Sequence, residues 1–185
     1  YRIFGNLGFG QTGDGHISAR DPELTDHFWL LRYGVPFRFA TVEELVLVAP
    51  DGTLAQGSGG INMAAYSIHH PIHQARPDVI AAAHSHSTHG RAFATLGRTL
   101  EPLTQDSCIF YEDHVVIEAQ GGAVVLELDA GKELAAAFPS GKAAIHQNHG
   151  LFTVGETVDE AVFWFVSMAR SCQPQLMAMA AGQPK

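Results

Sequence analysis

The sequence is poor in cysteine, in basic residues and in long apolar runs. Its two cysteines, Cys108 and Cys172, form neither a CxxC metal pair nor a disulfide scaffold, so we expect a reducing, cytoplasmic compartment. Eleven Lys and Arg against 19 Asp and Glu give a formal charge of -8, which argues against nucleic acid and against an anionic membrane surface as partners. No apolar run approaches the roughly 18 residues that a membrane span requires.

Internal repeats and low-complexity linkers are also missing. A chain of 185 residues with 46% hydrophobic content suits one globular domain, and we take residues 1–185 as that domain. The first residue is Tyr1, not Met, and it lies in an already patterned stretch. We therefore expect the N-terminus to be truncated.

Short apolar segments separated by Gly, Pro and Asp predict an α/β fold. Strands are expected over residues 44–48, 79–86, 122–128 and 143–147, and helices over residues 62–75, 131–138 and 159 to about 180. Thr157, with Glu160 three residues later, has the pattern of a capping box at the start of the last helix. Pro174 is expected to kink or end that helix.

What the chain does have is eleven histidines, several of them clustered. In AAAHSHSTHG, residues 81–90, His84 and His86 share one face at the end of an apolar strand, because strand side chains alternate. His149 in IHQNHG also follows an apolar strand, and the glycine after it permits a tight turn. Three imidazoles with an open position suit zinc or iron, so the pattern predicts a metal site, against the alternative of satisfied core or surface histidines.

The other clustered histidines are assigned differently. His89 lies beyond the strand end and is either a fourth ligand or a loop residue. His69, His70 and His73 fall on the helix over 62–75, with His69 and His73 on one face. No carboxylate accompanies them as in HExxH, so we expect packing or helix-end residues rather than zinc ligands.

Three motifs together resemble the class II aldolase/adducin family: RPDVIAAAHSHS, QNHGLFTVGETVDEA and GDGHISARDP. The resemblance spans nearly the whole chain in the family's order. It implies a three-layer α/β/α domain with a central, largely antiparallel sheet, and a homo-oligomer, commonly a tetramer, with active sites at subunit interfaces. It also implies that His84, His86 and His149 hold a divalent metal ion, zinc first, with Fe(II) or Mn as alternatives. In the family's aldolases that metal polarises substrate oxygens.

The resemblance fails at the residues that handle sugar phosphates. The family's acid/base glutamate falls on Ala65, and the serines that hold the phosphate fall on Met63 and Ala64. The asparagine of the family's GN-S loop is His16, and the tyrosine that protonates the product aligns near Gln105. We therefore expect a small-molecule substrate that is not a phosphorylated sugar.

Other side chains must then carry any acid/base chemistry. By residue type the candidates are His16, Tyr111 and His114, followed by Glu112 and Asp113. Asp106 and Asp113 are alternatively turn residues or groups that orient the histidines.

Three functions stay open. The first is a metal-dependent carbon–carbon lyase, a retro-aldolase or decarboxylase, acting on a small non-phosphorylated oxo or hydroxy acid or ketone. The second is a mononuclear non-haem iron oxygenase acting on an aromatic 2-oxo or hydroxy acid. The aromatic residues of the N-terminal part would suit its pocket, although core packing is the commoner use of such residues: Phe4, Phe9, Phe28, Trp29, Phe37 and Phe39. The third is a non-catalytic interaction module like the adducin head, which the three histidines disfavour.

Overall fold

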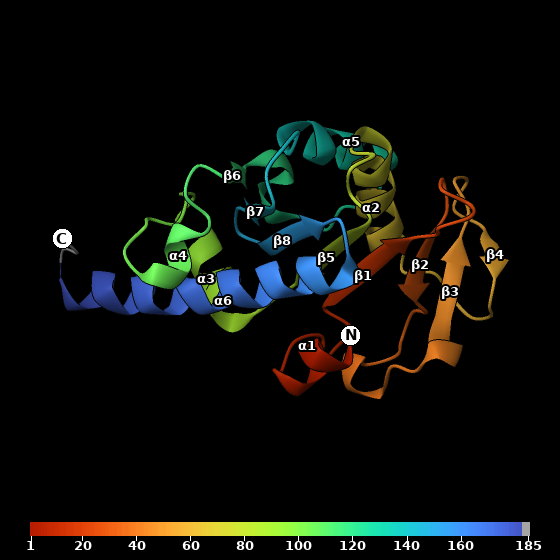
Figure 1. Cartoon of the computed structure of the whole chain (residues 1–185), viewed down its shortest axis with the longest axis horizontal. Coiled ribbons are helices and arrows are strands. Elements are labelled where there is room, and N and C mark those ends of the chain that lie inside the picture. The colour runs from red at the N-terminus through yellow and green to blue at the C-terminus, as the bar shows by residue number, and fades with distance from the viewer. Residues whose placement is uncertain (183–185) are drawn as a thin grey trace.

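Eight strands form one sheet in the order β4-β3-β2-β1-β5-β8-β7-β6 in the computed structural model, which describes residues 1–182 (Figure 1). All neighbours pair antiparallel except β6 and β7, which are parallel. The strands are β1 (Gly15–Arg20), β2 (Phe28–Leu31), β3 (Leu45–Val48), β4 (Leu54–Gln56), β5 (Ala81–Ser85), β6 (His114–Ile117), β7 (Ala143–His146) and β8 (Gly150–Gly155). The predicted α/β fold with a largely antiparallel sheet is confirmed.

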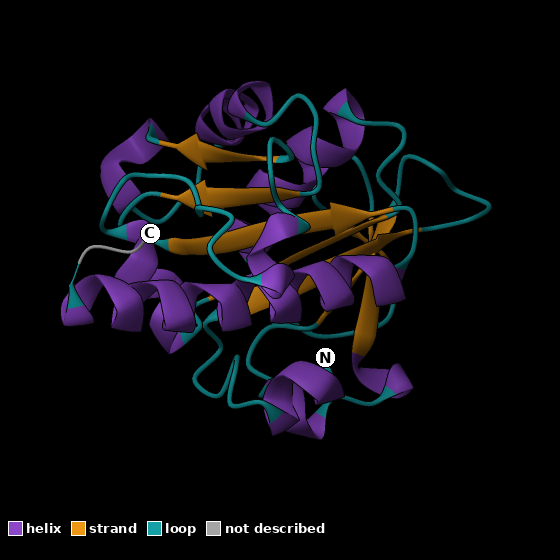
Figure 2. Ribbon diagram, turned by 60° about the vertical axis from the view of Figure 1, so that its left-hand side comes forward, coloured by secondary structure: helices purple, strands orange, loops and turns teal. Residues whose placement is uncertain are grey.

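Helices cover both faces of the sheet, as Figure 2 shows. They are α1 (Arg2–Asn6), α2 (Met63–Ala75), α3 (Thr88–Ala94), α4 (Gln105–Cys108), α5 (Leu128–Ala137) and α6 (Val158–Ala181). Helices α2 and α5 pack together on one face, while α6 and α3 cover the other. Among residues 1–182, no helix combines the length and apolarity needed to cross a membrane.

Strand alternation divides the side chains between the two faces. On β1, Ile17 joins the core under α6, whereas His16 and Ser18 point to α2 on the opposite face. On β5, Ala82 packs on the α2 side, and His84, two residues later, stacks on Phe152 of β8 on that same side. The α2 face of the sheet therefore carries His16 and Ser18 of β1 and His84 of β5.

Helices α2 and α5 approach closely at a proline. Pro71 inside α2 has no N–H, so the carbonyl of Ser67, four residues earlier, lacks its helical donor. A Cβ atom at Gly131 of α5 would lie 1.7 Å from that carbonyl oxygen. Glycine is thus required where α5 crosses α2.

Most predicted elements are confirmed, but the strand expected over 122–128 is wrong. Residues 123–127 pair with no strand, and Leu128 already begins α5. Val125 is buried while Val124 and Leu126 are exposed, so the segment alternates like a strand without a partner. The place beside β7 is taken by β6, which the sequence patterns did not reveal.

The last helix also differs from expectation. Helix α6 continues through Pro174 to Ala181, because Pro174 lies on the exposed side while the buried stripe, including Phe165 and Cys172, keeps the helix on the sheet. Thr157 caps it as predicted, accepting a hydrogen bond from the Glu160 N–H at 3.1 Å. The reciprocal bond of a capping box is shifted by one residue, since the Glu160 carboxylate accepts from the N–H of residue 156.

Candidate metal centre

Three histidines meet where strand β5 ends and the neighbouring strand β8 begins. His84 is on β5, His86 follows the end of β5, and His149 lies in the turn before β8. The ligand atoms that the three rings offer all lie within 4.8 Å of one another. The structure thus brings together the three residues predicted as metal ligands.

Close backbone packing makes this convergence possible. A Cβ atom at Gly150 would lie 3.0 Å from the Ser85 carbonyl oxygen and 3.3 Å from Cε1 of His84. It would also lie 3.4 Å from Cδ2 of His86. A side chain at position 150 would therefore require the Ser85 backbone or these two imidazoles to shift by a few tenths of an ångström.

The donor atoms fit a divalent metal ion. Nδ1 of His84 donates a hydrogen bond to the Leu151 carbonyl at 2.8 Å, which leaves Nε2 with its lone pair. Nδ1 of His149 is buried and has no hydrogen-bond partner among residues 1–182, a deficit that a metal or another ligand would relieve.

The electrostatics favour the neutral, ligating form of these rings. Burial, with smaller contributions from neighbouring imidazoles, lowers the pKa of His149 to about 4. Burial likewise lowers the pKa of His84 well below its usual 6.5, and lowers that of His86. Neutral imidazoles are the form that binds zinc or iron, so the site does not depend on proton release at pH 7.

The three histidines line a cavity of about 480 Å³. Its walls come from the loop before β1, the start of α2 and the segment that had been expected as a strand: Gly13–His16, Tyr33, Ile61–Ala64, Ile68 and Val124–Leu126. No Lys or Arg is among these described lining residues. The cavity therefore offers a phosphate group no cationic side chain, in agreement with the loss of the family's phosphate residues.

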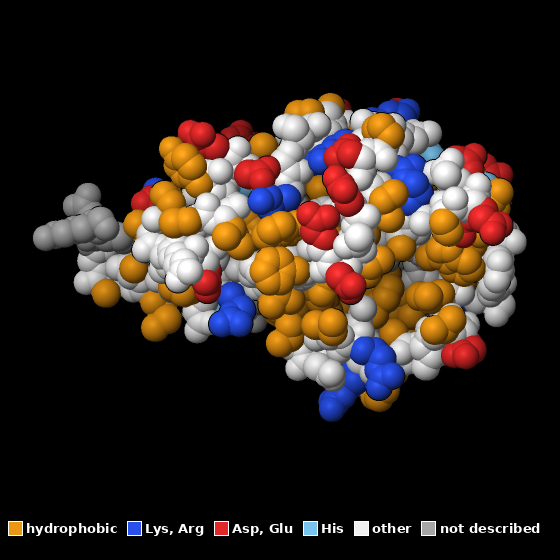
Figure 3. Space-filling view, in the orientation of Figure 1, with side chains coloured by type: hydrophobic (Ala, Val, Ile, Leu, Met, Phe, Trp, Pro, Cys, Tyr) orange, Lys and Arg blue, Asp and Glu red, His pale blue; other side chains and the backbone are white. Residues whose placement is uncertain are grey.

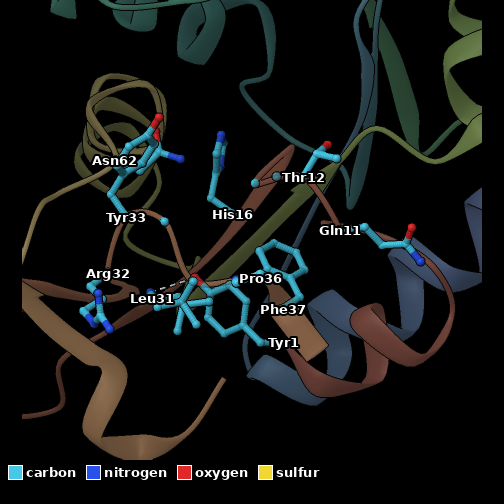
Figure 4. Close-up of a pocket in the computed structure, with 14 residues that line it drawn as sticks. Tyr1, Gln11, Thr12, His16, Leu31, Arg32, Tyr33, Pro36, Phe37 and Asn62 are labelled. Carbon is cyan, nitrogen blue, oxygen red and sulfur yellow. Dashed lines mark hydrogen bonds between the residues drawn. The ribbon is translucent and has the colours of Figure 1, made fainter. Parts of the chain in front are cut away.

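A second cavity of about 330 Å³ adjoins the first, since Tyr33, His16 and Asn62 line both. Figure 4 shows the His16 ring between Asn62 and Thr12, with Tyr1 and Phe37 nearby. Of the aromatic residues singled out from the sequence, Phe37 lines this cavity, and the others do not line either one. His16 thus lines both the cavity of the three clustered histidines and the cavity with aromatic walls.

Tyr111 and His114 do not line the cavity of their own chain. Tyr111 is 60% exposed on the turn before β6. His114 uses both ring nitrogens on the backbone: Nδ1 donates to the Phe110 carbonyl at 2.5 Å, and Nε2 accepts from the Leu100 N–H at 2.8 Å. In its own chain, His114 therefore has both ring nitrogens bonded to the backbone.

The remaining candidates lie in structural positions. Asp113 pairs with Lys142 at 2.8 Å, Asp106 is in the first turn of α4, and Glu112 adopts a left-handed turn conformation with φ of 55°. His89 is in the first turn of α3 and is not in the group of three possible metal ligands. Neither Asp106 nor Asp113 lines the cavity of the three histidines in its own chain.

The sequence analysis missed a polar cluster that touches the site through His16. Nδ1 of His16 lies 2.5 Å from Nε2 of His69, and Ser18 Oγ lies 2.5 Å from Nδ1 of His69 and 2.8 Å from Nε2 of His73. His69 and His73 are buried, as their assignment to packing implies, but both are also hydrogen-bonded to Ser18. The available signal was the i, i+4 pair on α2 facing the H-x-S alternation on β1.

Comparisons with known proteins identify related sequences and structures. A family model described as "Class II Aldolase and Adducin N-terminal domain" matches residues 1–176. The chain is 44% identical over its whole length to decarboxylase NovR from Streptomyces niveus, covering 68% of that protein. It is 45% identical, over 98% of its length, to 4-hydroxy-3-prenylphenylpyruvate oxygenase/4-hydroxy-3-prenylbenzoate synthase from Streptomyces roseochromogenus subsp. oscitans, covering 66% of that protein. The chain thus spans about two thirds of the length of these relatives.

A solved structure is also similar to this chain. L-fuculose 1-phosphate aldolase from Glaciozyma antarctica PI12 superposes with a TM-score of 0.91 at 46% identity. The match covers 100% of this chain and 72% of that one.

Proposed function

Since the chain belongs to the class II aldolase/adducin family, we propose that it is a metal-dependent carbon–carbon lyase acting on a small, non-phosphorylated oxo or hydroxy acid. The observation that carries the proposal is the convergence of His84, His86 and His149 in a cavity whose described lining has no cationic side chain. Among lyases we favour a decarboxylase, because a relative with 44% identity is named as one.

The chain's own residues fit that reaction. A divalent metal held by the three histidines, zinc in the first instance, would act as a Lewis acid toward the substrate's oxygens. Ala65, at the position of the family's glutamate, is fully buried and cannot transfer a proton. Decarboxylation suits this arrangement, since it needs no base to remove a proton from carbon. Ile68 and Val125 contribute apolar side chains to the cavity wall.

The adjoining cavity supports an aromatic group on the substrate. Tyr1, Tyr33 and Phe37 line it, and His16 connects it to the metal ligands. An oxo or hydroxy acid whose polar end reaches the histidines could place an aryl group against these rings. Aromatic rings in such walls contribute about 0.5–1.5 kcal/mol each beyond their burial.

A second candidate function is a mononuclear non-haem iron oxygenase acting on an aromatic 2-oxo or hydroxy acid. It is favoured by the relative of 45% identity that is named an oxygenase, together with the aromatic cavity. The ligand set argues for the lyase, because iron(II) oxygenases usually include a carboxylate and the three ligands here are histidines. An adducin-like module without catalysis would leave the clustered imidazoles without a purpose.

One experiment separates these functions. The protein is purified without added metal under anaerobic conditions, its iron, manganese and zinc are measured, and it is incubated with aromatic 2-oxo and hydroxy acids with and without oxygen. A decarboxylase releases carbon dioxide in both conditions, and His86→Ala abolishes both metal and release. Release that requires oxygen and consumes it contradicts the lyase and supports the iron oxygenase. Absence of metal with no turnover contradicts both.

We further propose that the chain forms a homo-oligomer, a tetramer as is common in the family, with Tyr111 reaching the site of a neighbouring copy. Apolar side chains gather over α6 and beside it in Figure 3, and Phe163 and Met177 of α6 are 58% and 64% exposed.

Hybrid oligomers test this arrangement. Tyr111→Phe and His84→Ala should each lower kcat more than about 10-fold when expressed alone. Co-expressed, they should regain activity, because mixed assemblies contain sites with an intact Tyr111 and an intact His84. A mixture no more active than its parents, or a monomeric mass in light scattering, would contradict the shared site.

A further inference from the structure

A buried hydrogen-bonded chain leads from a backbone carbonyl to the metal cavity. It starts at the carbonyl of Val79, which lies 3.2 Å from Nδ1 of His73. It passes from Nε2 of His73 through Ser18 Oγ to Nδ1 of His69, and from Nε2 of His69 to Nδ1 of His16, with distances of 2.8, 2.5 and 2.5 Å. The side chains are all nine-tenths buried or more. The chain joins α2 to β1 and ends in the site.

Its fixed end determines the direction of every bond. A carbonyl oxygen only accepts, so Nδ1 of His73 must carry the proton. His73 is neutral at pH 7, because burial lowers its pKa to about 4, and its Nε2 is therefore an acceptor. Nε2 of His73 therefore accepts a hydrogen bond from the Ser18 hydroxyl. The Val79 carbonyl also accepts from the Arg20 guanidinium at 3.1 Å, which holds this end in place.

The same logic continues to the cavity. The Ser18 hydroxyl donates its one hydrogen bond to His73. Ser18 Oγ must therefore accept the hydrogen bond from Nδ1–H of His69. His69 is neutral too, since burial lowers its pKa well below 6.5, and its Nε2 accepts from Nδ1–H of His16. His16 is then left with an unprotonated Nε2. Within residues 1–182, Nδ1 is the ring nitrogen of His16 that forms a hydrogen bond.

We propose that Ser18, His69 and His73 are positioning residues that lock His16 in its Nδ1–H tautomer, so that Nε2 of His16 accepts a hydrogen bond from a hydroxyl of the bound ligand. The assignment of the ligand rests on the proposed function, whereas the tautomer rests on the bonds alone. His16 lines both cavities, and its ring centroid is 4.8 Å from that of His84. It is outside the group whose ligand atoms lie within 4.8 Å of one another, which favours contact with the ligand over coordination of the metal.

Breaking the chain in the middle gives an asymmetric result that a purely structural cluster would not. In Ser18→Ala, His73 keeps its carbonyl partner and should stay in the Nδ1–H tautomer. His69 loses the acceptor that fixes it, so His69 and His16 should both become mixtures of the two neutral tautomers. Ser171→Ala is the matched control, because Ser171 is equally buried and its hydroxyl is bonded to a carbonyl in α6.

Nitrogen-15 NMR of histidine-labelled, zinc-treated protein measures this directly, with each ring assigned by a single replacement. The expected wild-type result is Nδ1–H for His16, His69 and His73. An Nε2–H tautomer at His16, or a Ser18→Ala spectrum in which His16 is unchanged, would overturn the proposal. Should Ser18→Ala fail to fold, Ser18→Cys keeps the volume with a weaker donor and should show the same asymmetry.

Turnover and metal content provide an independent readout. Ser18→Ala should lower kcat about 10- to 100-fold while KM and the metal content stay within about twofold, as for loss of a residue that orients a functional group. Loss of metal in His16→Ala would make His16 a ligand and overturn its role as acceptor. If the wild type turns over no oxo or hydroxy acid, the proposed function fails. The NMR result still decides whether the hydrogen-bonded chain fixes the tautomer of His16.

Discussion

Replacing His84, His86 or His149 with alanine is expected to lower metal affinity more than about 100-fold. Loss of an outer-shell partner typically costs 10- to 100-fold, and loss of a ligand removes the bond itself. Among the described residues, His84, His86 and His149 are the group whose ligand atoms lie within 4.8 Å of one another, so each variant is expected to remove one of three ligands. Competition with a fluorescent chelator measures the affinity, and all three variants should be catalytically inactive.

Thermal unfolding gives a second measure of the same change. Zinc at about 100 times its Kd stabilises the native state by roughly 2.7 kcal/mol, which for a chain of this size raises Tm by about 5–10 °C. The wild type should show this rise, and the three variants should not. His89→Ala is the matched control, because His89 lies three residues after His86 and outside the ligand group. A variant of His84 that keeps full affinity, or a His89 variant that loses it, would refute the assignment.

The three clustered histidines could be found from the sequence because each one is tied to a local pattern. Period-two alternation puts His84 and His86 on one face, and a strand end followed by glycine locates His149. Pairing of β5 with β8, which brings the two ends together, is not a local property; the family resemblance supplied it.

The hydrogen-bonded chain from the Val79 carbonyl to His16 could not be predicted in the same way. The spacing of His69 and His73 was visible, but its meaning depends on packing of α2 across β1, where His16 and Ser18 face the helix. The strand prediction over residues 122–128 is wrong for the converse reason. Its alternation is real, yet the segment pairs with no strand, and the place beside β7 is taken by β6. Instead Val125 closes the cavity wall.

Acid should destabilise the metal-free protein well before its carboxylates are protonated, and His73 should be a principal cause. Burial, the nearby Arg20 guanidinium and the His70 ring lower the pKa of His73 to about 4, against about 6.5 in the unfolded chain. His69 and Ser18 face the same ring, and Phe28 stacks on it. Between these two pH values the unfolded chain binds a proton that the folded chain does not.

The stabilisation from neutral His73 is therefore complete above pH 6.5 and falls as the pH is lowered toward 4, by about 3 kcal/mol in all. Urea unfolding with a chelator, at pH values from 7 to 4.5, measures this slope. His73→Phe keeps the shape of the ring and removes the proton site, so its slope should be lower by up to 1.4 kcal/mol per pH unit. Ser171→Ala, which removes a buried side chain without a proton site, should leave the slope unchanged. Equal slopes for the wild type and His73→Phe would show that this ring takes up its proton in the folded state as readily as in the unfolded chain.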